Sequence, residues 1–234
     1  MRNAVFTQAR PDSLFYPHSK PPLGCVLDLK GRPFSGGTIL DNSPYGNHGA
    51  ITGATWERLP SGLWWNKLDD TDDVIDCGTS ASLAFTTAFS FVFWFKIHTN
   101  RNYHDIYTRA VLNTDGYWLG LEESPGVGSY RFIFDTEQAG AYTRTTSTGG
   151  DFVANAIYMG AVVFNTNTTT FYKNGLPLVG GGAQTAPLAG TRTFYRGKGN
   201  LQNFPSGMYL GLDGAFNRAL SAAQVMSIFQ QIGV

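Results

Sequence analysis

The chain has 234 residues, of which 42% are hydrophobic and 15% are charged, with 28 glycines and 17 phenylalanines. Its 17 basic and 17 acidic side chains give a formal net charge of zero, which argues against a protein drawn electrostatically to nucleic acid or to an anionic membrane. No apolar run approaches the ~18 residues of a membrane-spanning helix, so we expect no membrane insertion. The first residues also lack the continuous apolar stretch of a signal peptide.

Residues 1–23 are predicted to form an extended arm. Prolines recur through this segment, and proline removes a backbone donor and disfavours helix. The same segment carries the aromatic side chains Phe6, Phe15 and Tyr16. A disordered tail is usually poor in aromatic residues. We therefore expect these three side chains to dock on a protein surface, on another chain rather than on their own domain.

Residues 24–234 are predicted to form one domain of short strands and tight turns. Alternating apolar residues predict strands at residues 25–29, 50–52, 63–66 and 73–77. The run D-N-S-P-Y-G-N-H-G at residues 41–49 combines Asp, Asn and Ser, which bond to local backbone, with glycines, which accept positive φ. This run predicts a compact double turn.

Residues 88–98, with the sequence A-F-S-F-V-F-W-F-K-I-H, are predicted to form the central strand. Four phenylalanines occupy one parity of a strict two-residue repeat, and the other parity is also largely apolar. Both faces of this strand should therefore be covered, one by the main core and one by a second layer. Phe91 and Phe93 are expected to be almost fully buried.

The second half of the chain continues the same pattern. Strands are predicted at residues 105–112, 117–121, 130–134, 141–145, 157–165 and 208–212. A hairpin is predicted over residues 169–178, with Asn174 and Gly175 in a type I′ turn. The one predicted helix spans residues 221–231, where Ser221 and Gln224 form a capping box and Gly233 ends the helix.

Cys25 and Cys77 are the only cysteines. Both lie in runs that read as strands. Since nothing else in the sequence indicates an oxidising compartment, buried free thiols are favoured over a disulfide.

Four stretches in this order resemble the concanavalin A-like and laminin-G-like jelly rolls, in particular their bacterial and viral branch. They are the run at residues 41–49, the acidic turn and phenylalanine strand at 72–96, F-Y-K-N-G at 171–175, and L-D-G-A-F-N-R-A-L-S-A-A-Q-V at 212–225. The resemblance implies an all-β, two-sheet antiparallel jelly-roll sandwich with one short C-terminal helix. The arm before Gly24 and residues 180–207 depart from it. It does not imply one function, because this sandwich carries lectins, receptors, hydrolases and virion proteins.

The glutamates argue against hydrolysis. The retaining glucanases among the proteins of this resembled fold carry E-x-D-x-x-E on one strand, and their carboxyl groups lie ~5–5.5 Å apart. This chain has glutamate only at Glu57, Glu122, Glu123 and Glu137, and adjacent residues on a strand point to opposite faces. We therefore expect no enzyme activity and no catalytic residues.

Calcium is a candidate cofactor, because relatives on this fold hold it with Asp and Asn side chains and loop carbonyls. Ca²⁺ takes about 6–8 oxygen ligands. By resemblance, Asp28, Asn47 and Asp213 stand where such ligands lie, and Asp41 is the next candidate. In the alternative interpretation, Asp41 and Asn47 cap their own turn and Asp213 anchors the turn before the helix.

Aromatic and polar side chains on strands or loops are the candidates for contact with a ligand or partner, because they can stack on a sugar or on a protein surface. The candidates are Tyr103, Tyr107, Trp118, Tyr142, Tyr195 and Arg196. The last two lie in the basic aromatic run F-Y-R-G-K at residues 194–198, which a long surface loop would also explain.

Two functions follow from the sequence. The first is a structural subunit that decorates or builds a virion or another extracellular surface assembly, attached to other protein subunits by its arm. The second is a calcium-dependent, lectin-like module that binds a glycan. The aromatic arm favours the first, and the family resemblance favours the second.

Overall fold

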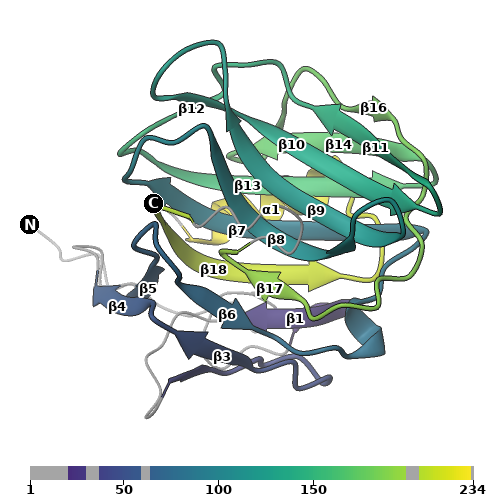
Figure 1. Cartoon of the computed structure of the whole chain (residues 1–234), viewed down its shortest axis with the longest axis horizontal. Helices are drawn as coiled ribbons and strands as arrows, with labels where there is room; N and C mark the ends of the chain where they lie inside the picture. The colour runs from purple at the N-terminus through teal and green to yellow at the C-terminus, as the bar shows by residue number, and fades with distance from the viewer. Residues whose placement is uncertain (1–20, 30–36, 59–63, 199–205, 233–234) are drawn as a thin grey trace, which may run out of the picture.

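The computed structural model describes residues 21–29, 37–58, 64–198 and 206–232. Most of the predicted arm, including Phe6, Phe15 and Tyr16, lies outside these residues. Within them the chain forms two antiparallel sheets packed face to face, as predicted (Figure 1). No helix in the described part of the chain is long and apolar enough to cross a membrane.

The sheet around the phenylalanine strand, here the β7 sheet, has the order β15-β14-β13-β7-β18-β5-β4, with β1 paired to β18 and β16 paired to β14. Its strands are β1 (Cys25–Leu29), β4 (Thr55–Arg58), β5 (Trp64–Lys67), β7 (Ala88–Ile97), β13 (Ile157–Asn165), β14 (Thr168–Lys173), β15 (Leu176–Pro177), β16 (Gly182–Ala183) and β18 (Met208–Phe216).

The other sheet, here the β9 sheet, has the order β11-β10-β9-β8-β17-β6-β3-β2, with β12 paired to β10. Its strands are β2 (Thr38–Ile39), β3 (Gly49–Thr52), β6 (Val74–Asp76), β8 (Tyr103–Val111), β9 (Asp115–Glu123), β10 (Ser129–Gln138), β11 (Ala141–Thr146), β12 (Phe152–Val153) and β17 (Tyr195–Arg196). Figure 1 looks onto this sheet, with the β7 sheet and the helix behind it.

The main core lies between the sheets and is built on β7, as predicted. The side chains of Phe91 and Phe93 are 0% exposed, and their rings contact aromatic rings of the opposite sheet, such as Tyr107 and Phe132. The other parity of β7 packs into a second apolar layer with Val225 of the helix. Both faces of the strand are therefore covered because both carry apolar side chains.

Local signals placed the turn and the helix correctly. Asn174 and Gly175 both have positive φ, at 49° and 82°, which suits the predicted type I′ turn. Helix α1 spans Ala222–Ile232. The Ser221 hydroxyl accepts a bond from the Gln224 amide, and the Gln224 side chain accepts one from the Ser221 amide, so the capping box is confirmed. Gly233 lies outside the described residues.

Both cysteines are buried free thiols, as predicted. Cys77 belongs to the core between the sheets, whereas Cys25 belongs to the layer beneath α1. Burial raises the pKa of the Cys77 thiol above its usual range, so this group stays protonated at neutral pH.

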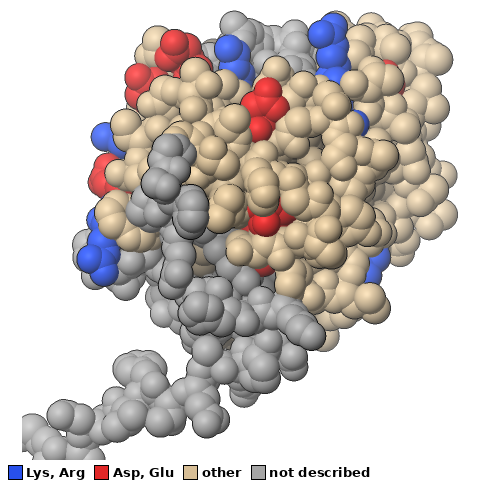
Figure 2. Space-filling model, turned by 90° about the horizontal axis from the view of Figure 1, so that it is seen from below, with Lys and Arg blue, Asp and Glu red and all other residues tan. Residues whose placement is uncertain are grey.

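Charged side chains are scattered over the lower face of the molecule. In the space-filling view of that face, single blue and red side chains lie among uncharged ones, with no continuous basic stretch among the described residues visible there (Figure 2). This agrees with the balanced composition.

Candidate functional site

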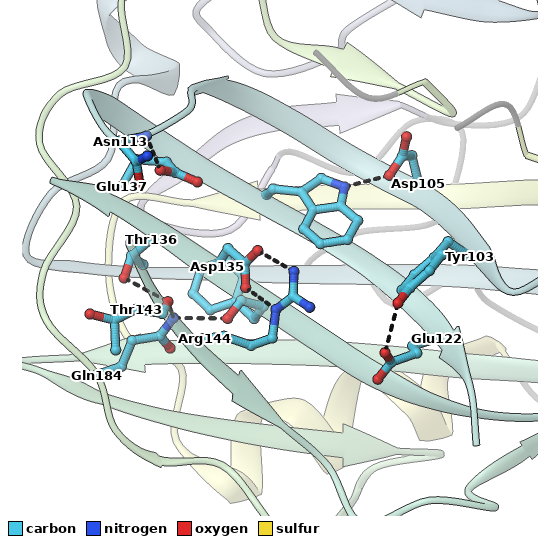
Figure 3. Close-up of polar contacts among 12 residues, drawn as sticks. Tyr103, Asp105, Asn113, Glu122, Asp135, Thr136, Glu137, Thr143, Arg144 and Gln184 are labelled. Carbon is cyan, nitrogen blue, oxygen red and sulfur yellow. Dashed lines mark hydrogen bonds and ion pairs between the residues drawn. The ribbon is translucent and has the colours of Figure 1, made fainter. Parts of the chain in front are cut away.

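Strands β8 to β11 carry a polar network on the side of the β9 sheet that faces away from the core. Along β9 and β10, Leu119, Leu121, Phe132 and Phe134 point into the core, so the residues between them point outward. We call this side the outer face. Its side chains include Trp118, Arg131 and Tyr142. Figure 3 shows six others on this face: Tyr103, Asp105, Glu122, Asp135, Glu137 and Arg144.

One row of the outer face is centred on Arg144. In the register of the sheet, Trp118 lies opposite Asp135, and Asp135 lies opposite Arg144. The Arg144 guanidinium donates to both Asp135 oxygens at 2.7 Å (Figure 3). It also lies 5.4 Å from the centroid of the Trp118 ring and 5.9 Å from that of Tyr142. The guanidinium is thus held by a bidentate ion pair and by cation–π contacts.

Trp118 lies flat on the sheet because its neighbour along the outer face is a glycine. A Cβ on Gly120 would lie 3.0 Å from the Trp118 ring and 2.7 Å from the His104 carbonyl oxygen. The indole N–H donates to the Asp105 carboxylate. Glycine therefore makes room for the ring, and Asp105 fixes its orientation.

A second row joins Tyr103, Glu122 and Arg131. The Tyr103 hydroxyl donates to Glu122 Oε1 at 3.0 Å, and Arg131 donates to Glu122 Oε2 at 2.8 and 2.6 Å. These residues lie opposite one another in the register of β8, β9 and β10. The phenol and the guanidinium therefore share one carboxylate.

Burial shifts the acid–base behaviour of this face. It raises the pKa of Asp135, against the opposing effect of Arg144. It raises the pKa of Glu137 to about 7, with a further increase from the Asp135 charge. Glu137 Oε2 accepts the Asn113 amide at 2.7 Å. Glu137 is therefore partly protonated at neutral pH and sits beneath the β8–β9 turn.

The carboxyl groups on this face are engaged by neighbours. Both oxygens of Asp135 are bonded to Arg144, and both oxygens of Glu122 accept bonds from Tyr103 or Arg131. Asp135 and Glu137 stand two residues apart on one strand, which makes them the pair nearest to glycosidase chemistry. Asp135 forms an ion pair with Arg144, and Glu137 is buried. The arrangement suits hydrogen bonding to a ligand better than attack on one.

The structure places three of the six predicted contact residues on the outer face: Tyr103, Trp118 and Tyr142. Tyr195 is half-buried on β17. Tyr107 and Arg196 were expected at the surface, but they are 1% and 0% exposed. A register shift between Asp105 and Tyr107 breaks the alternation of β8, so Tyr107 turns into the core.

Arg196 lies in the interior because β17 inserts between β8 and β6. Its guanidinium forms an ion pair with Asp213 and donates to Asn66 Oδ1 at 2.7 Å and to the Gly211 carbonyl at 2.8 Å. Burial raises the pKa of Asp213 to about 6, while Arg196 and Tyr107 act to lower it. This buried pair connects the two sheets.

The predicted calcium ligands have other partners. The Asp41 carboxylate accepts four bonds, from the Asp28, Ser43 and Asn47 amides and from the Ser43 hydroxyl, at 2.7–2.9 Å. Those bonds use the roughly four lone-pair sites of a carboxylate. The side-chain amide of Asn47 donates to the Val26 carbonyl at 2.7 Å. With Asp213 paired to Arg196, these contacts do not fit a calcium site. Asp41 caps its own turn, as the alternative expected, but Asp213 lies inside β18 and does not anchor the turn before the helix. Calcium stays a prediction.

Sequence reasoning missed the arginines and carboxylates of the outer face. Asp135, Arg144, Glu122 and Arg131 are hydrogen-bonded across neighbouring strands, and their partners become known only when the register is known. The alternation of polar residues in R-F-I-F-D-T-E at 131–137 was the available signal.

A family model for the concanavalin A-like lectin/glucanase superfamily matches residues 69–226. The chain belongs to this superfamily. The match spans the phenylalanine strand, the whole outer face and the beginning of α1. A search of curated proteins finds no match.

Solved structures share the fold of this superfamily member at low identity. The binding domain of Paraclostridial Mosquitocidal Protein 1 has a TM-score of 0.70 and 16% identity, over 89% of this chain and 52% of that one. The receptor binding domain of botulinum neurotoxin C/D mosaic serotype has a TM-score of 0.65 and 15% identity, over 88% of this chain and 51% of that one. Trypanosoma rangeli sialidase, in complex with the inhibitor DANA, has a TM-score of 0.64 and 17% identity, over 91% of this chain and 34% of that one. The chain thus spans about half of the toxin domains and a third of the sialidase.

Proposed function

We propose that this chain is a non-catalytic binding domain that recognises a glycan through the outer face of β8–β11. The observation that carries the proposal is the preorganised network of Tyr103, Glu122, Arg131, Trp118, Asp135 and Arg144. Side chains already held in place lose little conformational entropy on binding, which favours affinity.

The chemistry of the network suits a polyhydroxylated ligand. Tyr142 is 49% exposed beside the Arg144 guanidinium, and an aromatic ring can cover the apolar face of a sugar. The guanidinium and carboxylate groups keep donors and acceptors for hydroxyl groups, since Asp135 uses two of the five N–H donors of Arg144. The superfamily and the toxin binding domains that share the fold are consistent with a binding role.

Catalysis is disfavoured by the same contacts. A hydrolase of this kind needs one ionised carboxylate and one carboxylic acid facing the substrate. On the outer face, Asp135 is paired with Arg144 and Glu137 is buried. The structural neighbours include a sialidase, so an assay for polysaccharide hydrolysis is the direct test of this point.

The proposal is tested with a glycan array followed by titration calorimetry on the strongest hit. Tyr142→Ala should weaken binding about tenfold, equivalent to about 1.4 kcal/mol. Tyr45→Ala is the matched control, because Tyr45 is 51% exposed but lies in the turn after Asp41. Absence of binding to any glycan, or equal losses for the two variants, would refute the proposal.

An assembly role is the second candidate, and it rests on the aromatic residues of the arm. Phe6, Phe15 and Tyr16 would each contribute roughly 1.5–3 kcal/mol on burial against a partner. Deleting residues 2–22 should leave the sandwich folded but abolish attachment to a virion or another extracellular assembly. A truncated protein that keeps its native oligomeric mass would leave glycan binding as the better account.

A further inference from the structure

We infer that the outer face selects uncharged glycans and rejects acidic ones, a specificity that rests on the proposed function. The inference comes from the pairing of charges. Both arginines that β8–β11 place on this face, Arg131 and Arg144, are already bonded to carboxylates of the same face.

The two pairs use the anion-binding edges of both guanidinium groups. Arg144 donates through Nε and one terminal nitrogen to the two Asp135 oxygens at 2.7 Å. Arg131 donates through the corresponding nitrogens to Glu122 at 2.8 and 2.6 Å. A sugar carboxylate is recognised best through that planar fork. In this protein, protein carboxylates occupy it.

The other outward side chains of these strands supply no further cation for an acidic sugar. Asp105 accepts the Trp118 indole, and Glu137 lies beyond Asp135 on β10. The other basic side chains of these strands lie elsewhere: His104 is buried, and Arg109 is bonded to the carbonyls of Gly190, Ser80 and Thr79. An acidic sugar would therefore meet two arginines that are already paired with Asp135 and Glu122. The charges of these two carboxylates oppose a third carboxylate, because like-charge contacts are unfavourable.

Sugar hydroxyl groups do not meet this obstacle. A hydroxyl both donates and accepts, so it can bond to the remaining guanidinium N–H groups and to a carboxylate without separating the pair. The Arg144 side chain is 32% exposed and the Arg131 side chain is 31% exposed, so both guanidinium groups are within reach of a ligand. The geometry points to a neutral oligosaccharide.

The experiment uses calorimetry on the full chain with two pairs of probes, each with one neutral and one acidic member. The first pair is galactose-terminated lacto-N-neotetraose and the same oligosaccharide capped by sialic acid. The second pair is cellohexaose and oligoglucuronate. We expect at least about tenfold tighter binding of a neutral member than of its acidic partner, with little dependence on sodium chloride. Equal or tighter binding of the acidic member would overturn the inference and leave the proposed function intact. Binding of neither member of either pair overturns both.

A gain-of-function variant tests whether the arginine–carboxylate pairs are what excludes acidic sugars. Asp135→Asn keeps the shape of the side chain but releases Arg144 from its ion pair, so binding of the sialylated probe should increase about tenfold. Glu122→Gln should do the same through Arg131, which guards against a folding defect in one variant. Thermal melting checks that each variant is folded. Folded variants that keep the wild-type preference would show that the pairs do not set specificity.

Discussion

We expect breaking the buried pair of Arg196 and Asp213 to lower the free energy of unfolding by a large amount. Both side chains are 0% exposed, and the guanidinium also satisfies Asn66 and the Gly211 carbonyl. Arg196→Met removes those bonds and leaves a buried carboxylate without its cation. Breaking a buried pair in this way typically costs about 3–5 kcal/mol, and we expect that loss in the free energy of unfolding at pH 7.

The loss should depend on pH, and its sign follows from the pKa of Asp213. Burial raises that pKa to about 6, and Arg196 opposes the increase, so removing Arg196 raises it further. A carboxyl with a raised pKa in the folded state contributes stability at low pH that is lost as the pH rises through that pKa. The deficit of the variant should therefore be larger at pH 8 than at pH 5.

Urea unfolding followed by circular dichroism at pH 5 and pH 8 measures both effects. The double variant Arg196→Met/Asp213→Asn is the control, since it removes the charge left unpaired and should recover part of the loss. A single-variant loss below about 1 kcal/mol, or a deficit that does not change with pH, would show that the pair is not held as described.

Three further predictions follow from the core, the turns and the outer face. Phe91→Ala should cost about 3–5 kcal/mol in urea unfolding, because a fully buried ring is removed from between the sheets; a loss under about 1 kcal/mol would contradict the packing. If Asp28 and Asp213 share calcium, chelation with EGTA should lower Tm and Asp213→Ala should abolish that difference, whereas coincident melting curves leave turn capping as the explanation. No neutral or acidic polysaccharide should be hydrolysed, and turnover abolished by Glu137→Gln or Asp135→Asn would overturn the non-catalytic assignment.

Most of the fold was predictable because its signals are local. The two-residue repeat of β7, the Asn174–Gly175 turn and the capping box at Ser221 each depend on residues within one element, and each was confirmed. The short strands β2, β4, β12, β16 and β17 were missed. Each has two to four residues, too few for a repeat to be read, and pairing with a neighbouring strand is what makes them extended.

The candidate site was only partly predictable because its chemistry is non-local. Aromatic character identified Tyr103, Trp118 and Tyr142, but the same criterion also selected Tyr107, which lies in the core. One register shift in β8 reversed that second inference. The partners of Arg131 and Arg144 depend on cross-strand register, and no local pattern encodes the register.

Substitutions on the outer face should leave the fold intact, for a reason found in the strands themselves. On β10, Phe132 and Phe134 fill the core while Arg131 and Asp135 face away from it, and the two sets alternate along one backbone. Core packing therefore constrains one set and leaves the other to ligand chemistry. Exchanging an outward carboxylate for its amide alters charge at nearly constant volume, so the sandwich should persist while the preferred ligand changes. This separation explains why one fold accommodates unrelated functions, and why the charge pairs, rather than the sandwich, carry the specificity proposed for this chain.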